Sequence, residues 1–281
     1  MNGMNFFDDE QKSNLVHYEG ELGVFDYDPR EFEIAFFCGE EYLHYCGNGK
    51  SVNLPDGCIN TRNMFRECHL PVGFSLGDKF DTSRVTSMEA MFSQCALLEG
   101  FSFGDRFDTS NVVNMHSMFF GGEISEGISL GDHFDTSNVT NMGNMFYRCV
   151  LSKGFSLGDK FDTSKVTIMS GMFEGSTLPE GFTLGDHFDT SRVVNMSVMF
   201  QDCVLPNGFT LGNLFDTSRV ELMRYMFHSS TLPEGFSLGN NFCTANVSDM
   251  QGMFKSCMFP GGFSFGNSFD VSRVTYTDDM F

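Results

Sequence analysis

The chain has 281 residues, 41% of them hydrophobic, which is enough to bury a substantial core in one or two domains. Its 37 acidic residues against 17 basic ones give a formal net charge of -20 and an isoelectric point near 4.5. This composition argues against an intrinsically disordered chain and against direct binding to a nucleic-acid backbone, which the negative charge would repel. It favours a protein partner with a basic surface.

The first 60 residues differ from the rest, because they carry no repeat and hold 12 acidic residues against 3 basic ones. Two segments, GVFDYDPREFEIAFF from residue 23 and EYLHY from residue 41, predict a pair of β-strands. We therefore expect residues 1–60 to form an acidic, β-hairpin-like N-terminal cap. The sequence shows no basic leader and no apolar run of secretory or membrane-spanning length, which predicts a cytoplasmic protein that does not bind membranes.

A repeat of 27 residues governs the remainder of the chain. The pair Met-Phe begins at residues 64, 91, 118, 145, 172, 199, 226, 253 and 280, and no insertion interrupts this spacing. Phe-Asp keeps the same interval at 80, 107, 134, 161, 188, 215 and 269, with Phe-Cys in its place at 242. Residues 61–281 are therefore predicted to be a solenoid of eight full or nearly full repeats, preceded by one partial repeat.

One repeat, Gly73 to Glu99, reads GFSLGDKFDTSRVTSMEAMFSQCALLE. Apolar and polar side chains alternate over residues 74–76, as in a short strand. The apolar residues between 85 and 95 fall at offsets 0, 3, 6, 7 and 10, which places them on one face of a short helix. Asp81, Thr82 and Ser83 come just before this segment and are residue types that cap the start of a helix or a turn. The unit is therefore predicted to be strand, turn, short helix and turn.

Because one unit of this size cannot cover its own apolar face, neighbouring units must stack and share a core. The predicted fold class is an α/β repeat solenoid, a leucine-rich-repeat-like stack of 27-residue strand–turn–short-helix units with an N-terminal β cap. Parallel strands would line one side and helices the other. Phenylalanine and methionine would fill the core columns that leucine fills in leucine-rich repeats.

The repeat core FDTSNVTNMGNMF, from Phe134 to Phe146, resembles the repeat of the BspA-like bacterial proteins, a leucine-rich-repeat-like family common on bacterial surfaces. The resemblance covers about residues 61–281, and the YLHY segment at Tyr42 to Tyr45 is similar to the lead-in of such proteins. It implies a solenoid used for adhesion or protein binding, with no catalytic residues.

Two rows of aspartates recur at the repeat interval and are the candidate binding residues. The first row follows the core phenylalanine and the second precedes it: Asp81, Asp108, Asp135, Asp162 and Asp189, and Asp78, Asp105, Asp132, Asp159 and Asp186. Stacked units would bring carboxylates to about 5 Å from one another, with a repulsion of about 1 kcal/mol for each pair even in water. The aspartates are interpreted either as caps of their own helix or turn, or as an acidic binding face. Next to the second row runs a row of basic residues that would partly neutralise it: Lys79, Arg106, His133, Lys160 and His187.

No arrangement in the sequence predicts a metal site, a cofactor or a catalytic site. The GDxFD pattern lacks the acidic density and the closing glutamate of a calcium loop, and the seven histidines show no HxxH or HExxH spacing. Five cysteines share one repeat position, which predicts buried core thiols rather than disulfides or nucleophiles. These are Cys68, Cys95, Cys149, Cys203 and Cys257.

Together these observations predict a non-enzymatic, protein-binding solenoid scaffold with a strongly acidic surface. An alternative is a nucleic-acid-mimicking inhibitor, because stacked carboxylates approach the charge spacing of a phosphate backbone. Such a protein could occupy the basic groove of a nuclease or of an anti-phage or CRISPR complex. A third hypothesis, a surface adhesin, requires an export route. The sequence leaves the oligomeric state and the identity of the partner open.

Overall fold

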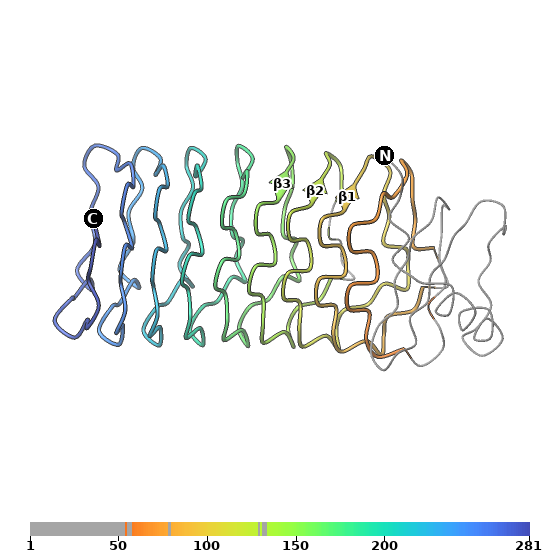
Figure 1. The fold of residues 1–281 in the computed structure, drawn as a ribbon, viewed down its shortest axis with the longest axis horizontal. Coiled ribbons are helices and arrows are strands. Elements are labelled where there is room, and N and C mark those ends of the chain that lie inside the picture. The colour runs from red at the N-terminus through yellow and green to blue at the C-terminus, as the bar shows by residue number, and fades with distance from the viewer. Residues whose placement is uncertain (1–53, 55–57, 78–79, 129, 131–133) are drawn as a thin grey trace, which may run out of the picture.

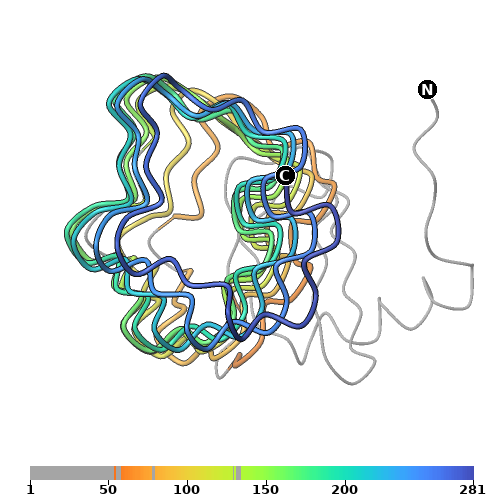
Figure 2. The same ribbon diagram turned by 90° about the vertical axis from the view of Figure 1, so that its left-hand side faces the viewer.

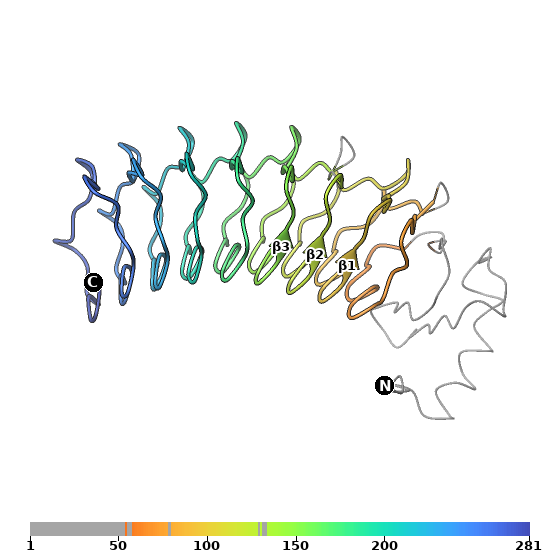
Figure 3. The ribbon, with the colours of Figure 1, turned by 90° about the horizontal axis from the view of Figure 1, so that it is seen from above.

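The computed structural model describes residues 54, 58–77, 80–128, 130 and 134–281. Over these residues the chain winds as a stack of coils, in which each 27-residue unit follows the same path beside its neighbour (Figure 1). Seen along the stack, the coils superimpose around a common interior (Figure 2), and they succeed one another in chain order (Figure 3). The N-terminal cap expected over residues 1–60 lies outside the described residues, apart from residues 54 and 58–60.

Parallel pairing joins each coil to the next. The strands β1 (Ala96–Leu97), β2 (Glu123–Ile124) and β3 (Val150–Leu151) form a sheet in the order β1-β2-β3. Each strand pairs residue for residue with the one 27 residues ahead, and isolated parallel bridges continue this column as far as Met258. A second column of bridges runs from Asn60 to Tyr276 at the same interval. Because bridged residues differ by one repeat length, the sequence period sets the register of the stack.

The interior is a continuous core built from the repeated apolar positions. A column of phenylalanines runs through it, with ring centroids 5.1–5.9 Å apart and ring planes 3–10° from parallel. Its members are Phe65, Phe92, Phe119, Phe146, Phe173, Phe200, Phe227 and Phe254, and none is more than 1% exposed. Each ring therefore packs against rings of the neighbouring coils, and no coil buries its core alone.

The short helix predicted over residues 85–95 is wrong, because this segment is a succession of turns. Only alternate amides bond locally, as Met91 N–H does to the carbonyl of Met88 at 3.2 Å. The amides between them donate to the next coil, as Ala90 N–H does to the carbonyl of His116 at 2.8 Å. In addition, the φ angle of Ala90 is 52°, in the left-handed region that a right-handed helix excludes.

The spacing of the coils explains why helices do not form here. Successive core rings lie 5.1–5.9 Å apart, whereas an α-helix with its side chains is roughly 10 Å wide, so helices in neighbouring coils would overlap. Turns whose alternate amides reach the next coil fit this spacing. The predicted apolar face nevertheless corresponds to the inward side of the segment, since Val85, Met88, Met91 and Phe92 are all 0% exposed.

The alternation predicted at residues 74–76 is confirmed by burial. Phe74 and Leu76 are 0% exposed, and Ser75 between them is partly exposed. Only an isolated bridge joins Ser75 to its equivalent one repeat later, so the named strands lie elsewhere in the unit. The glycine that follows has a positive φ in every described repeat, 76° at Gly104, a conformation that favours glycine. At Gly104 a Cβ would also lie 2.5 Å from the carbonyl oxygen of Gly77.

Candidate functional site

Each aspartate of the first acidic row caps its own turn. The Oδ1 atom of Asp81 accepts a hydrogen bond from the amide of Ser83 at 3.0 Å, and Asp108 accepts one from Ser110 at 2.8 Å. The same bond recurs at 2.8–2.9 Å in the other members of the row and in two aspartates at the same repeat position that extend the row toward the C-terminus: Asp135, Asp162 and Asp189, and Asp216 and Asp270. The prediction that these residues cap a turn is confirmed, and each carboxylate is thereby held in place on its coil.

A ladder of buried threonines, absent from the sequence-based predictions, runs beneath this row. Thr82 and its equivalents as far as Thr244 are 0% exposed. Each Oγ1 donates to the backbone carbonyl at the aspartate position of the next coil, at 2.6–2.8 Å. A buried hydroxyl requires a hydrogen-bond partner. The threonine that recurs at this position in seven successive coils, from Thr82 to Thr244, was the signal that could have revealed the ladder. It ties the acidic row together from coil to coil.

The second acidic row is exposed. Asp105, Asp159 and Asp186 lie at the surface, and none makes a hydrogen bond or ion pair with another described residue. Asp78 and Asp132 lie outside the described residues. The three described carboxylates of this row are therefore available to a partner without first breaking a bond within the chain.

Among the described residues, one ion pair joins a basic side chain to the first acidic row, at Asp81. Arg106 Nη1 lies 3.3 Å from Asp81 Oδ2 in the preceding coil, and both side chains are well exposed, so the pair contributes less than about 1 kcal/mol. Hydrogen bonds from the hydroxyl and the amide of Ser83, with a smaller contribution from Arg106, lower the pKa of Asp81. Asp81 therefore stays ionised at neutral pH.

A further row of exposed cations, which the sequence-based predictions missed, follows the first acidic row in the repeat sequence. Three residues after the aspartate, five coils carry a basic side chain: Arg84, Lys165, Arg192, Arg219 and Arg273. The corresponding residue in the remaining full coils is asparagine. The FDTSR, FDTSK and FDVSR motifs carried this signal. The surface around the first acidic row is therefore mixed in charge rather than uniformly acidic.

An open depression lies between two rows of this surface in the C-terminal half of the stack. It has a volume of about 400 Å³ and is lined by Val194, Arg219, Glu221, Asn246 and Ser248, which come from three successive coils. The residues occupy two repeat positions, one at the cation row and one two residues later. The depression thus combines one cation, one carboxylate, two uncharged polar groups and one apolar side chain.

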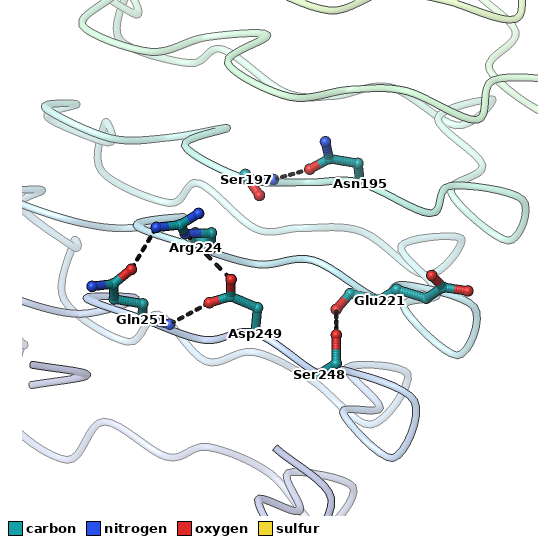
Figure 4. A network of polar contacts seen from close by, with 7 residues as sticks. All are labelled: Asn195, Ser197, Glu221, Arg224, Ser248, Asp249 and Gln251. Atoms are coloured by element: carbon teal, nitrogen blue, oxygen red, sulfur yellow. Dashed lines mark hydrogen bonds and ion pairs between the residues drawn. The ribbon is translucent and has the colours of Figure 1, made fainter. Parts of the chain in front are cut away.

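Polar side chains near this depression bond to one another across coils (Figure 4). Arg224 Nε lies 3.3 Å from Asp249 Oδ2, and Arg224 Nη2 donates to Gln251 Oε1 at 2.5 Å. Asp249 Oδ1 accepts the amide of Gln251 at 3.1 Å. Ser248 Oγ donates to the backbone carbonyl of Glu221 at 3.2 Å, while the Glu221 carboxylate points away from Ser248 (Figure 4). Arg224 is thus neutralised within the chain, and the Glu221 carboxylate is not part of this network.

Four of the five cysteines at the shared repeat position are buried as predicted, namely Cys68, Cys95, Cys149 and Cys203, whereas Cys257 in the penultimate coil is only half-buried. Burial raises the pKa of Cys95, Cys149 and Cys203 to about 12. Among the described residues, no group of three or more His, Cys, Asp or Glu side chains is arranged to hold a metal ion. Over the same residues, no helix has the length and apolar character that a bilayer crossing needs.

A family model matches most of the chain. It is described as "Mycoplasma protein of unknown function, DUF285", and it matches residues 59–177, 151–259 and 210–281. These ranges overlap, as is expected when one model can be placed on successive copies of a repeat. No curated protein and no solved structure matches the chain.

Proposed function

The chain belongs to the repeat family described as Mycoplasma protein of unknown function, DUF285. We propose that it is a non-enzymatic scaffold that binds a protein partner. The observation that carries this proposal is the division of the repeat positions between core and surface. Positions such as those of Val85 and Phe92 keep their residue type from repeat to repeat, and both of these residues are 0% exposed. Exposed positions such as that of Arg84 change from coil to coil. A constant core supports the stack, while a varied surface can encode recognition.

We further infer that the stack is a leucine-rich-repeat-like solenoid of the BspA-like kind. Two observations support this inference. The core string from Phe134 to Phe146 resembles the BspA-like repeat, and parallel bridges join residues one repeat apart along the described coils. A long stack of equivalent coils offers an extended surface, which suits a protein-sized partner.

The partner is proposed to present a basic surface to the acidic rows. The second row supports this proposal most directly, since Asp105, Asp159 and Asp186 are exposed and have no bonding partner among the described residues. Aspartates of the first row are less available, because each already accepts the amide of its own turn. We therefore expect the second row to contribute more to partner binding than the first.

The proposal is tested by affinity capture from a lysate of the native host, with bound proteins identified by mass spectrometry. The test variant is Asp105→Asn, Asp159→Asn and Asp186→Asn combined, which removes three exposed charges and no hydrogen bond described within the chain. Its matched control removes three exposed carboxylates from another row. The control changes are Glu99→Gln, Glu126→Gln and Glu180→Gln. Both variants lose the same net charge.

A partner that binds the wild type and the control but not the test variant is the expected result. Equal retention by both variants would rule out the second acidic row as the binding face. The nucleic-acid mimic is distinguished in the same experiment, because its partner would be a basic nucleic-acid-binding protein that salt releases and that DNA or RNA displaces. If the wild type captures no partner, the scaffold proposal is wrong.

A further inference from the structure

Three cations lie at the same position of three successive coils. Lys165, Arg192 and Arg219 are all exposed, and we call them the cation strip. None of them forms an ion pair within the described part of the chain, although Lys165 Nζ donates to Asn138 Oδ1 at 2.6 Å. The core rings of these coils are 5.7 Å apart, so the strip places like charges at close, regular intervals.

The carboxylates around the cation strip neutralise it only in part. Three residues earlier in each of the same coils stands an aspartate of the first row, and its Oδ1 atom accepts the amide of its own turn. Glu221 lies two residues beyond Arg219 and also lines the depression. By contrast, Arg224 in the same coil is paired with Asp249. The cation strip therefore keeps an unused capacity to bind carboxylates.

The depression of about 400 Å³ extends the strip at one end, with Arg219 in its wall. Val194 supplies an apolar surface for the methylene groups of a bound side chain, and Asn246 and Ser248 supply polar groups. An acidic side chain that enters the depression could place its carboxylate against the Arg219 guanidinium, a pairing that can be bidentate. Glu221 is the group that opposes it.

We propose that the cation strip and the depression bind an extended, acidic peptide segment of a partner protein. In an extended segment, side chains on one face recur about every 6.7 Å, so three alternate acidic residues span roughly 13 Å. The three cations span two coil steps, roughly 10 Å at the usual strand spacing. Long arginine and lysine side chains can absorb this difference. A segment with acidic residues at alternate positions, lying along the axis of the stack, therefore fits the strip.

A peptide is favoured over a nucleic acid by the rest of the surface. The chain carries a net charge of -20, and aspartates flank the cation strip along its length. A long polyanion would extend beyond the strip and be repelled by these negative charges. A short acidic segment stays close to the strip, and charges farther away than the screening length of about 8 Å repel it little. This inference goes beyond the proposed function, because the acidic rows and the cation strip bind opposite charges.

The test measures binding of a fluorescein-labelled peptide of alternating glutamate and serine to the full chain by fluorescence anisotropy at low salt. The test variant combines Lys165→Gln, Arg192→Gln and Arg219→Gln. The matched control combines Arg84→Gln, Lys153→Gln and Arg273→Gln, which also removes three exposed cations. Arg84 and Arg273 occupy the same repeat position as the cation strip. In the full coil next to each of them this position holds an asparagine, so neither belongs to a run of consecutive cations.

We expect the test variant to bind the peptide about tenfold more weakly and the control less than about twofold more weakly. Glu221→Gln should tighten binding about twofold, because it removes the opposing carboxylate. This single change also tests the proposal if the triple variant does not fold, which thermal unfolding monitors.

Three results would overturn the proposal. One is the absence of peptide binding by the wild type, and another is equal weakening in the two triple variants. The third is single-stranded DNA of equal charge binding the strip as tightly as the peptide does. None of these results depends on the partner sought by affinity capture, so failure here leaves the test of the acidic rows intact.

Discussion

Replacing Ala90 with glycine distinguishes the turns observed over residues 85–95 from the helix that the apolar spacing predicts there. Ala90 has a φ of 52°, a left-handed conformation that costs an L-residue about 1–2 kcal/mol. Glycine removes this strain. In opposition, glycine loses more conformational entropy on folding, about 0.5–1 kcal/mol, and the loss of a partly buried methyl costs about 0.4 kcal/mol. The sum lies between about 0.4 kcal/mol against the variant and about 1 kcal/mol in its favour, so we expect a change near zero or a small stabilisation.

A helix would instead give a clear loss, since glycine in a helix interior costs about 1 kcal/mol relative to alanine. The repeat itself supports the turn, because glycines stand at the equivalent position at Gly171 and Gly252, with φ of 63° and 59°. The assay is urea unfolding followed by circular dichroism, with the midpoint compared at constant slope. Ala96→Gly, in the strand β1, is the control and should destabilise by about 0.5–1 kcal/mol. If Ala90→Gly lowers stability as much as the control does, the reasoning about this turn is refuted.

Three further predictions concern the core and its edge. Thr190→Val removes the donor of a 2.8 Å hydrogen bond to a backbone carbonyl in the next coil and should lower the free energy of unfolding in urea by about 1–3 kcal/mol. The control Thr190→Ser keeps this bond. Equal losses in the two variants would contradict a role for the hydroxyl. Phe200→Ala leaves a cavity between two phenylalanine rings whose centroids lie 5.7 Å on either side, and it should lower the free energy of unfolding by about 3–5 kcal/mol. A decrease below about 1 kcal/mol would argue against the stacked core. Hydrogen bonds lower the pKa of Asp81 in the folded chain below its ordinary value of 3.8. The ionised Asp81 carboxylate therefore stabilises the fold fully above pH 3.8, and this stabilisation is lost as the pH falls through the folded-state pKa. Asp81→Ala should therefore destabilise more at pH 7 than at pH 2, and a pH-independent difference in the unfolding midpoint would contradict this.

The repeat, the core and the capping aspartates were predictable because each depends on neighbours that are close in sequence or one repeat away. The interval between Met-Phe pairs identified the unit, and the residues at its apolar positions, such as Phe92, are buried in the structure. Asp81 and Ser83 are two residues apart, so the hydrogen bond between them is local and follows from residue type. The binding roles of the aspartate rows remain predictions.

The helix could not be excluded from the sequence, because the offsets that mark a helix face also describe a turn segment with the same inward residues. Two further features depend on the contact between coils. Thr82 bonds to a carbonyl in the next coil at 2.8 Å, and the bond exists only because stacking brings that carbonyl within reach. Arg192 and Arg219 are 27 residues apart, and only the parallel register makes them neighbours on one surface.

The sequence by itself determined the 27-residue period, the division of each unit into inward and outward residues, and the local capping of the aspartate turns. These properties follow from side-chain hydrophobicity and from bonds between residues close in the chain. The tertiary structure decided the backbone conformation of residues 85–95, the threonine ladder and the mixed charge of the surface. Each of these depends on the distance between coils, because a spacing between core rings of 5.1–5.9 Å leaves no room for helices and brings equivalent side chains into contact.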